Sequence, residues 1–344
     1  MDKWRGLRLP PIPPGHIKEQ FVSHHQQRHP LLRRQDVGPV EKTLVDNSDI
    51  PMKTVNSVSG GQTSAYLMKH YPADYNLFAL VRINAPDAAP KDPWIKKYVE
   101  SKIDAEFIAT AEEDEIFYTL YDLEQFTGQE IHWVTNPSFD EILSDRGHGI
   151  LPSTHRRYCT AEMKVVPVAK WIVDNIGEVV EMRLGFRAGE DRRVQAKMDS
   201  ANADGLEEAR WPVGKHRGGR NKWETFAYAK YTFPLHATGV YNDMIRQYWK
   251  DKPVRFAERN NCIGCFHRNP ILLNLMAKKF PEKYAWFEAQ ENAGRTKVNK
   301  SGKLMSWNCF RTDGSYEDFR QHRTQLTMED LDGFTDCDSG YCGM

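Results

Sequence analysis

The chain has 344 residues, with 47 basic and 47 acidic side chains, a formal net charge of zero and 40% hydrophobic residues. This length allows one large domain or two smaller ones, and the composition is that of a globular protein. Such a composition excludes a disordered chain, a collagen-like fibre and a disulfide-dense secreted scaffold. No apolar run approaches the roughly 20 residues of a membrane span, and the first residues contain no apolar signal segment. We therefore expect a cytoplasmic protein with no membrane partner.

Residues 1–50 differ from the rest of the chain. They are rich in proline and histidine, carry more Lys and Arg than Asp and Glu, and show no sustained apolar period. Proline-rich segments resist both helix and strand. We expect either a tail that drapes over the domain or a basic arm that contacts a nucleic acid or a partner.

Strands and helices alternate after residue 50. Short apolar runs predict strands within 53–61, 76–84, 106–110, 131–135 and 179–187. Amphipathic segments predict helices over 62–71, 114–128 and 163–175. A strand–helix–strand unit forms a parallel strand pair. The segment 51–195 therefore predicts an α/β domain: an open, mostly parallel sheet with helices on both faces.

The pattern changes beyond residue 195. Residues 196–232 are polar and rich in Gly, Lys and Arg, which predicts a polar surface loop. Residues 233–344 predict a helical, cysteine-containing C-terminal region. Within the polar stretch, residues 214–222 form a basic run that is suited to a phosphate backbone. Aromatic residues that follow this run can stack on bases, although such residues more often pack in a core.

A glycine pair lies between the first predicted strand and its helix. Gly60 and Gly61 permit a sharp turn and bring backbone N–H groups close to a ligand. The following helix points its positive end at the same place, as in a phosphate-binding turn. The spacing of a Walker A loop is missing, and such a turn can equally be a plain connection. The candidate binding residues are Ser57, Ser59, Gly60, Gly61, Gln62, Thr63 and Ser64.

Six cysteines in a chain without a signal segment indicate reduced thiols that bind metal or perform chemistry. Cys262 and Cys265 have the two-residue gap with which two thiolates hold one ion. Cys159 is the candidate third ligand. The candidate fourth is Cys309, with Cys337 and Cys342 as alternatives. Four thiolates suit Zn²⁺ or an iron–sulfur cluster, and spacing alone does not separate the two. A sulfur-carrying or redox pair, or inert thiols, are the other hypotheses.

The glycine segment resembles the SGGxxS loop of the PP-loop ATP pyrophosphatases, with Thr63 where many members have Asp. Three further segments resemble elements of one branch of that superfamily, the phosphoadenosine phosphosulfate (PAPS) reductase-like proteins of phages and mobile elements. This branch is related to enzymes of DNA phosphorothioation and tRNA thiolation. The three segments are Arg156–Thr160 with Lys164 and Pro167, Gly185–Arg193, and Asn261–Phe266.

The resemblance implies an adenine-nucleotide-hydrolase-like fold that binds ATP, or the sulfonucleotides PAPS or APS, together with Mg²⁺. It also favours a [4Fe–4S] cluster over zinc at the cysteines. Lys164, Arg187 and Arg193 are then the candidate catalytic cations, and Arg192 is a candidate phosphate ligand, because guanidinium groups pair with phosphate oxygens. The alternative is that these arginines pair with Glu190 and Asp191 at the surface.

Three hypotheses about function follow. The first is a PP-loop enzyme that adenylates an acceptor, such as a nucleic acid, for sulfur transfer from a cysteine desulfurase. The second is a sulfonucleotide reductase that uses a thioredoxin-like donor and a tail nucleophile, Cys342. The third is a nucleotide- or metal-binding module without turnover. The resemblance places the protein in the cytoplasm of a bacterium or a phage-infected host.

Overall fold

The computed structural model describes residues 51–145, 150–294, 296–298, 304–306 and 308–321. The chain divides into two compact units, Met1–Pro51 and Met52–Met344, and all described strands and helices belong to the second. The predicted N-terminal arm and the tail cysteines Cys337 and Cys342 lie outside the described residues. None of the helices in the described ranges is long and apolar enough to cross a membrane.

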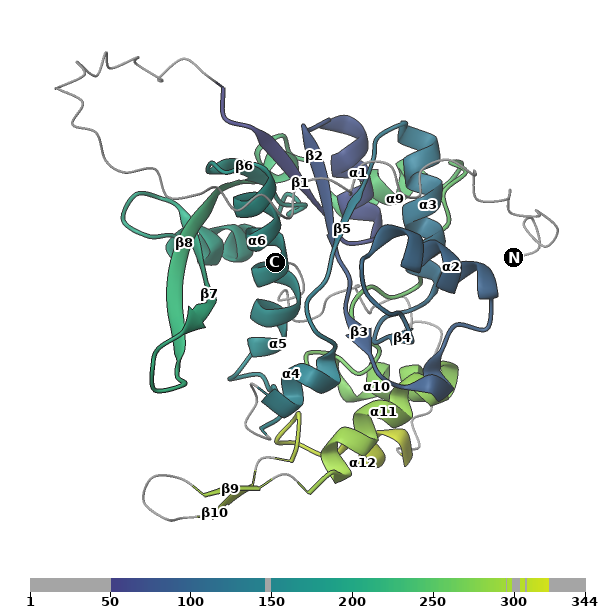
Figure 1. Cartoon of the computed structure of the whole chain (residues 1–344). Helices are drawn as coiled ribbons and strands as arrows, with labels where there is room; N and C mark the ends of the chain where they lie inside the picture. Colours follow the sequence, from purple (N-terminus) through teal and green to yellow (C-terminus); the bar gives the residue numbers. More distant parts are fainter. Residues whose placement is uncertain (1–50, 146–149, 295, 299–303, 307, 322–344) are drawn as a thin grey trace, which may run out of the picture. The chain divides into compact units, whose positions relative to one another are not determined.

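Six strands form one sheet in the order β5-β2-β1-β6-β8-β7 (Figure 1). Neighbouring strands pair in parallel, except that β7 pairs with β8 in the antiparallel sense. The predicted α/β class with a mostly parallel sheet is therefore confirmed. The strands are β1 (Thr54–Val58), β2 (Tyr75–Ala79), β5 (His132–Val134), β6 (Val180–Arg183), β7 (Glu207–Lys215) and β8 (Asn221–Thr232).

Helices cover both faces of the sheet because its central strands are apolar on both sides. Val58 and Phe78 pack into one core with the helices on one face, whereas Val55 and Leu77 pack into a second core with α6 and α7 on the other face. Successive strand residues point to opposite faces, which explains this division. The helices are α1 (Gln62–His70), α2 (Pro93–Lys102), α3 (Glu115–Thr127) and α9 (Asn242–Trp249) on the first face, and α6 (Val166–Asn175) and α7 (Asp191–Asp199) on the second.

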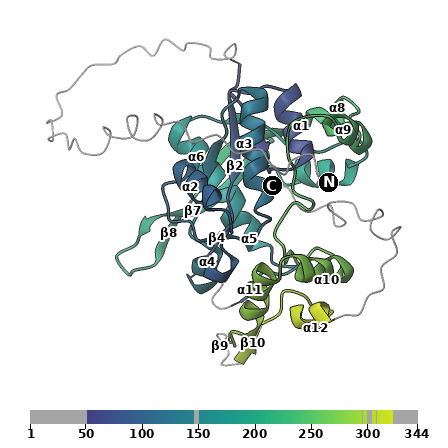
Figure 2. The same ribbon diagram turned by 90° about the vertical axis from the view of Figure 1, so that its right-hand side faces the viewer.

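A third core lies beside the sheet, where the C-terminal helices pack on a small strand pair. Figure 2 shows α10, α11 and α12 grouped at one end of the unit. The elements around this core are β3 (Arg82–Ile83), β4 (Ala109–Thr110), α4 (Phe139–Asp145), α10 (Pro270–Lys279), α11 (Pro281–Asn292) and α12 (Tyr316–Gln321). The remaining short elements are a 3₁₀ turn (Pro86–Ala88), α8 (Pro234–Ala237), β9 (Thr296–Val298) and β10 (Leu304–Ser306).

The helix that leads to the sheet's second face contains an irregular turn. α5 (Tyr158–Thr160) continues through a π-helical turn (Ala161–Val165) into α6. Wide turns of this kind occur mostly inside α-helices and often at functional sites. The candidate catalytic residue Lys164 lies in this turn.

The prediction of a polar loop over 196–232 is wrong for most of that stretch, because β7 and β8 form a long antiparallel hairpin there. On β7, buried Ala209 and Trp211 alternate with exposed Glu208 and Arg210. The exposed face and the glycine-rich turn make the segment polar on average. Composition alone therefore concealed the two-residue period of the strand.

The core around α3 contributes to the stability of the fold. Leu120 is fully buried between α3 and its neighbours, and truncating it to alanine leaves a cavity. We expect Leu120→Ala to lower the free energy of unfolding by about 2–5 kcal/mol, measured by urea denaturation. The control is Met198→Ala, since Met198 is 60% exposed. Equal losses in the two variants would contradict this packing.

Candidate functional site

The turn between β1 and α1 leaves little room for a side chain at either of its glycines. Gly60 has φ of +75°, which side chains disfavour, and a Cβ there would lie 3.2 Å from the Ile116 Cβ. A Cβ on Gly61 would lie 2.4 Å from the Asn260 Nδ2. The first glycine is needed for the backbone angle, and the second allows the turn to approach the segment that precedes Cys262.

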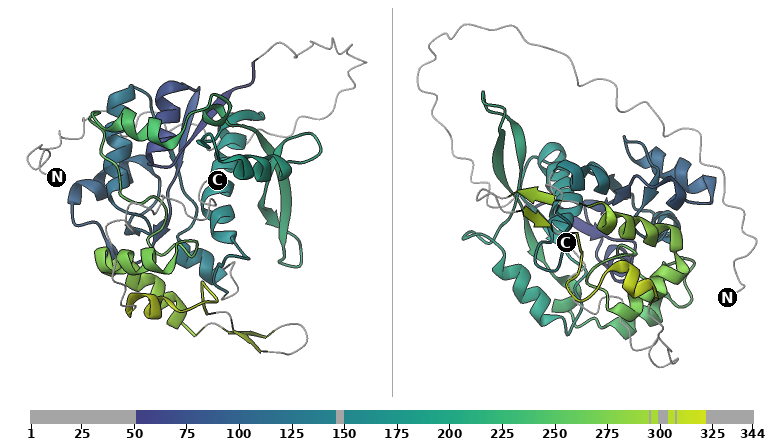
Figure 3. Two further views of the ribbon diagram at one scale, coloured as in Figure 1. Left: turned by 180° about the vertical axis from the view of Figure 1, so that it is seen from behind. Right: turned by 90° about the horizontal axis from the view of Figure 1, so that it is seen from below.

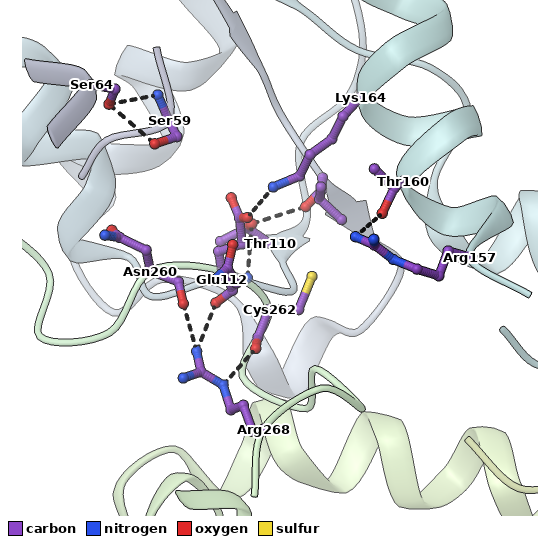
Figure 4. Close-up of polar contacts among 12 residues, drawn as sticks. Ser59, Ser64, Thr110, Glu112, Arg157, Thr160, Lys164, Asn260, Cys262 and Arg268 are labelled. Carbon is purple, nitrogen blue, oxygen red and sulfur yellow. Dashed lines mark hydrogen bonds and ion pairs between the residues drawn. The ribbon is translucent and has the colours of Figure 1, made fainter. Parts of the chain in front are cut away.

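Serine hydroxyls stabilise this turn from within. The Ser59 N–H donates to the Ser64 Oγ at 3.1 Å (Figure 4). The Ser64 Oγ–H donates to the Gly61 carbonyl at 3.0 Å. The Trp249 Nε1–H on α9 donates to the Gln62 carbonyl at 3.0 Å. Ser64 therefore shapes the turn, while the first N–H groups of α1 have no partner within the helix and are available to a ligand.

The turn lines a cavity at the carboxyl ends of the parallel strands, which we call the loop cavity. Open α/β sheets bind ligands at this edge. The structure brings most of the predicted loop and cation residues together here, but Gly60, which is buried, and Arg192, which is exposed, are not among the lining residues. The predicted residues that line the cavity are Ser57, Ser59, Gly61, Gln62, Thr63, Ser64, Lys164, Arg187 and Arg193.

Sequence reasoning missed several lining residues. Asn242 comes from α9, and Asn260 and Asn261 come from the segment before Cys262. The pair Asn260 and Asn261, next to the cysteine motif, could have been recognised from the sequence as candidate polar ligands. The apolar wall residues could not be recognised in this way, because apolar residues in strands and helices indicate only a buried core. They include Leu77, Phe78, Ala79, Val168, Leu184 and Phe186.

Glu190 holds the two cavity arginines. The Arg193 Nη1 lies 2.5 Å from the Glu190 carboxylate, and the Arg187 Nε lies 3.3 Å from it. The Arg187 Nη1 also donates to the Asn242 Oδ1 at 2.7 Å. Burial alone would raise the pKa of Glu190, but the Arg187 N–H and the two guanidinium charges outweigh burial and lower it. The predicted pairing with Glu190 is thus present, whereas Asp191 instead contacts His236 at 2.8 Å.

A second cavity adjoins the first, and we call it the thiol cavity. Cys159, Cys262 and Cys265 line it together with mostly apolar side chains. Lys164 and Asn261 line both the thiol cavity and the loop cavity. The two cavities are therefore separated by little more than these side chains.

Lys164 is anchored by a buried carboxylate. Its Nζ lies 3.0 Å from the Glu112 Oε1, and Glu112 is only 4% exposed (Figure 4). The Glu112 carbonyl accepts a hydrogen bond of 2.6 Å from the buried Lys283, whose Nζ also lies 2.7 Å from Asp114. These contacts connect the π-helical turn, the end of β4 and α11 at one point.

A buried arginine shapes the cysteine segment. Arg268 is 6% exposed and donates to the carbonyls of Asn260 at 2.7 Å, Cys262 at 3.2 Å and Asn261 at 3.3 Å. Asn261 has φ of 75°, a strained angle for a residue with a side chain. Such strain is common at ligand sites, and here the arginine helps to hold it.

The described residues do not complete the predicted four-thiolate site. Cys309 is exposed and does not line the thiol cavity, and burial, Glu291 and Asp318 raise its pKa. Within the described ranges, no group of three His, Cys, Asp or Glu side chains is placed to hold a metal ion. Burial, and then the charge of Cys265, raise the pKa of Cys159 to about 11. A metal or cluster at these thiols thus stays a prediction.

Comparison with solved structures gives a structural likeness. Neither a scan against protein-family models nor a search of curated proteins finds a match. A search of solved structures finds the crystal structure of a phosphoadenylyl-sulfate (PAPS) reductase from Candida auris in a phosphate complex. The identity is 12% and the TM-score 0.32, over 61% of this chain and 77% of that chain. A similarity of this size says nothing about substrate or activity.

The burial of the thiols predicts their order of reaction. Thiolates react with maleimides, and burial and then the charge of Glu112 raise the pKa of Cys262 well above its usual value. After chelation of any metal, we expect N-ethylmaleimide to label the exposed Cys309 at least about tenfold faster than Cys262. Peptide mass mapping over a time course measures both rates in the same protein. Labelling of Cys262 as fast as Cys309 would contradict the described burial.

Proposed function

We propose that this chain is a nucleotide-dependent sulfur-transfer enzyme of the PP-loop type. It binds ATP in the loop cavity, adenylates an acceptor with release of pyrophosphate, and so prepares the acceptor for sulfur. The observation that carries the proposal is that Lys164 and Asn261 line both the loop cavity and the thiol cavity. The cavity that we propose for the phosphates and the cavity with three cysteines are thereby adjacent.

The chemistry of the loop cavity suits a nucleotide. The N–H groups at the start of α1 and its helix dipole favour phosphate oxygens. Arg187 and Arg193 add two positive charges against the one negative charge of Glu190, so this group keeps a net charge of +1. The apolar wall formed by residues such as Leu77 and Phe186 suits a base and a ribose.

The proposed reaction balances in two steps. An acceptor oxygen attacks the α-phosphorus of ATP, the bond to the bridging oxygen breaks, and pyrophosphate leaves. Hydrosulfide then attacks the acceptor carbon, a carbon–sulfur bond forms, and AMP leaves with the former acceptor oxygen. The cations of the cavity, Lys164 among them, offset the charge that develops on the phosphate oxygens in the first step. Mg²⁺ accompanies ATP as part of the substrate.

Adjacent arginines provide a matched test of nucleotide binding. Arg187→Met or Arg193→Met removes a guanidinium group that lines the cavity, whereas Arg192→Met removes an exposed one. We expect each cavity variant to weaken ATP binding by roughly 10- to 100-fold, as for a lost hydrogen bond to a charged group. Isothermal titration calorimetry should show the Arg192→Met affinity within about twofold of wild type. Equal losses in all three variants would contradict this assignment.

Product analysis separates the proposed reaction from the reductase hypothesis. The proposal expects pyrophosphate from ATP when acceptor mixtures and sulfide are supplied. Release of sulfite from PAPS or APS under reducing conditions, without pyrophosphate from ATP, would instead support the reductase. Tight nucleotide binding with neither product would favour a binding module.

A further inference from the structure

The hairpin of β7 and β8 extends beyond the rest of the sheet. The pairing of β8 with β6 begins at Ala229, so residues 221–228 pair only with β7. Figure 3 shows this ribbon extending away from the helices in both views. The first part of β8 therefore adds no strand pairing to the parallel part of the sheet.

The end of this hairpin is strongly basic. Residues 210–224 contain five Lys or Arg side chains and one Glu, a net charge of +4, although the whole chain is neutral. The single acid, Glu224, lies 2.5 Å from Lys222. Within the part of the chain that the structure describes, no carboxylate pairs with the other four cations, which are exposed: Arg210, Lys215, Arg217 and Arg220.

The turn at the tip is well defined. The His216 N–H donates to the Arg220 carbonyl at 2.8 Å, and the Gly219 N–H donates to the His216 carbonyl at 2.9 Å. Gly219 has φ of +77°, an angle that favours glycine. These bonds hold Arg217 and Arg220 on one tight turn, at the end of the ribbon.

The two faces of the ribbon differ in charge. Residues that pair across the strands share a face, and Arg210, Lys215 and Trp223 lie on one of them by the register. The Arg210 guanidinium lies 5.5 Å from the centre of the Trp223 ring. Glu224 lies opposite Trp211 on the other face, where Trp211 stacks on Phe226 at 4.2 Å and packs near Lys170 of α6. The face with Trp223 thus carries cations and an aromatic ring without an acid.

We propose that this hairpin, residues 210–225, is a nucleic-acid-binding arm whose cations contact the phosphate backbone. A two-stranded ribbon fits the major groove of duplex DNA, which is about 12 Å wide. Among residues 210–224 only Val213 is a large, exposed apolar side chain, so the arm lacks the apolar centre of a protein interface. Of the aromatics near the run, Phe226 and Tyr228 pack in the protein, whereas Trp223 is half-buried and lies on the face with Arg210 and Lys215.

The test measures binding of the full chain to labelled duplex DNA by fluorescence anisotropy over a range of salt concentrations. The arm variant is Arg217→Glu with Arg220→Glu. The control replaces two exposed lysines outside the arm, Lys97→Glu with Lys250→Glu, and so has the same net charge as the arm variant. We expect the arm variant to bind more than about tenfold more weakly, and its slope of log K against log salt to be shallower by roughly 2. The control should stay close to wild type.

Three outcomes would overturn the proposal. The first is equal weakening in the control, which would mean that only net charge matters. The second is no binding of duplex DNA, single-stranded DNA or RNA by wild type at low salt. The third is stronger binding of polyglutamate than of DNA, which would indicate an acidic protein partner. Circular dichroism and thermal melting confirm folding, and ATP titration of the arm variant keeps this result separate from the nucleotide site.

Discussion

Two cavities of different chemistry share the side chain of Lys164, and a buried carboxylate fixes where that side chain lies. Glu112 is almost completely buried, so its negative charge requires a partner, and Lys164 supplies one at 3.0 Å. The backbone of Glu112 is fixed in turn by the buried Lys283. Removing one member of such a buried pair is costly, which gives the wide π-helical turn around Lys164 a structural reason to persist.

The second constraint is the close approach of the glycine turn to the cysteine segment. Gly61 has no side chain, and Asn260 occupies the space where one would be. Arg268 holds the carbonyls of Asn260 and Cys262, so the cysteines are positioned by the same contacts that form one wall of the loop cavity. Sequence-distant segments around residues 61, 164 and 261 thereby meet at one edge of the sheet.

The sequence predicted the parts of the fold that depend on local pattern. The strand of β1, the glycine turn and α1 follow from apolar periodicity and glycine conformation, as does the α/β class. The pairing of Arg187 and Arg193 with Glu190 was one of two alternatives that the sequence left open. Nothing local shows that Arg192, between them in the sequence, is exposed instead. The hairpin was missed because exposed polar residues mask the strand period. Cys309 was a candidate fourth ligand because it is a cysteine, whereas the fold places it outside the lining of the thiol cavity.

In the proposed complex, a nucleotide lies against the glycine turn, next to the cysteine segment. Hydrogen–deuterium exchange of the full chain, with and without ATP and Mg²⁺, tests it directly. We predict slower exchange at the amides of residues 59–65 and 185–193 and around residues 260–262, because a ligand in the loop cavity contacts or closes over all three. Exchange in residues 215–221 should not change. Protection that is confined to other segments, or no protection at saturating ATP, would contradict this account.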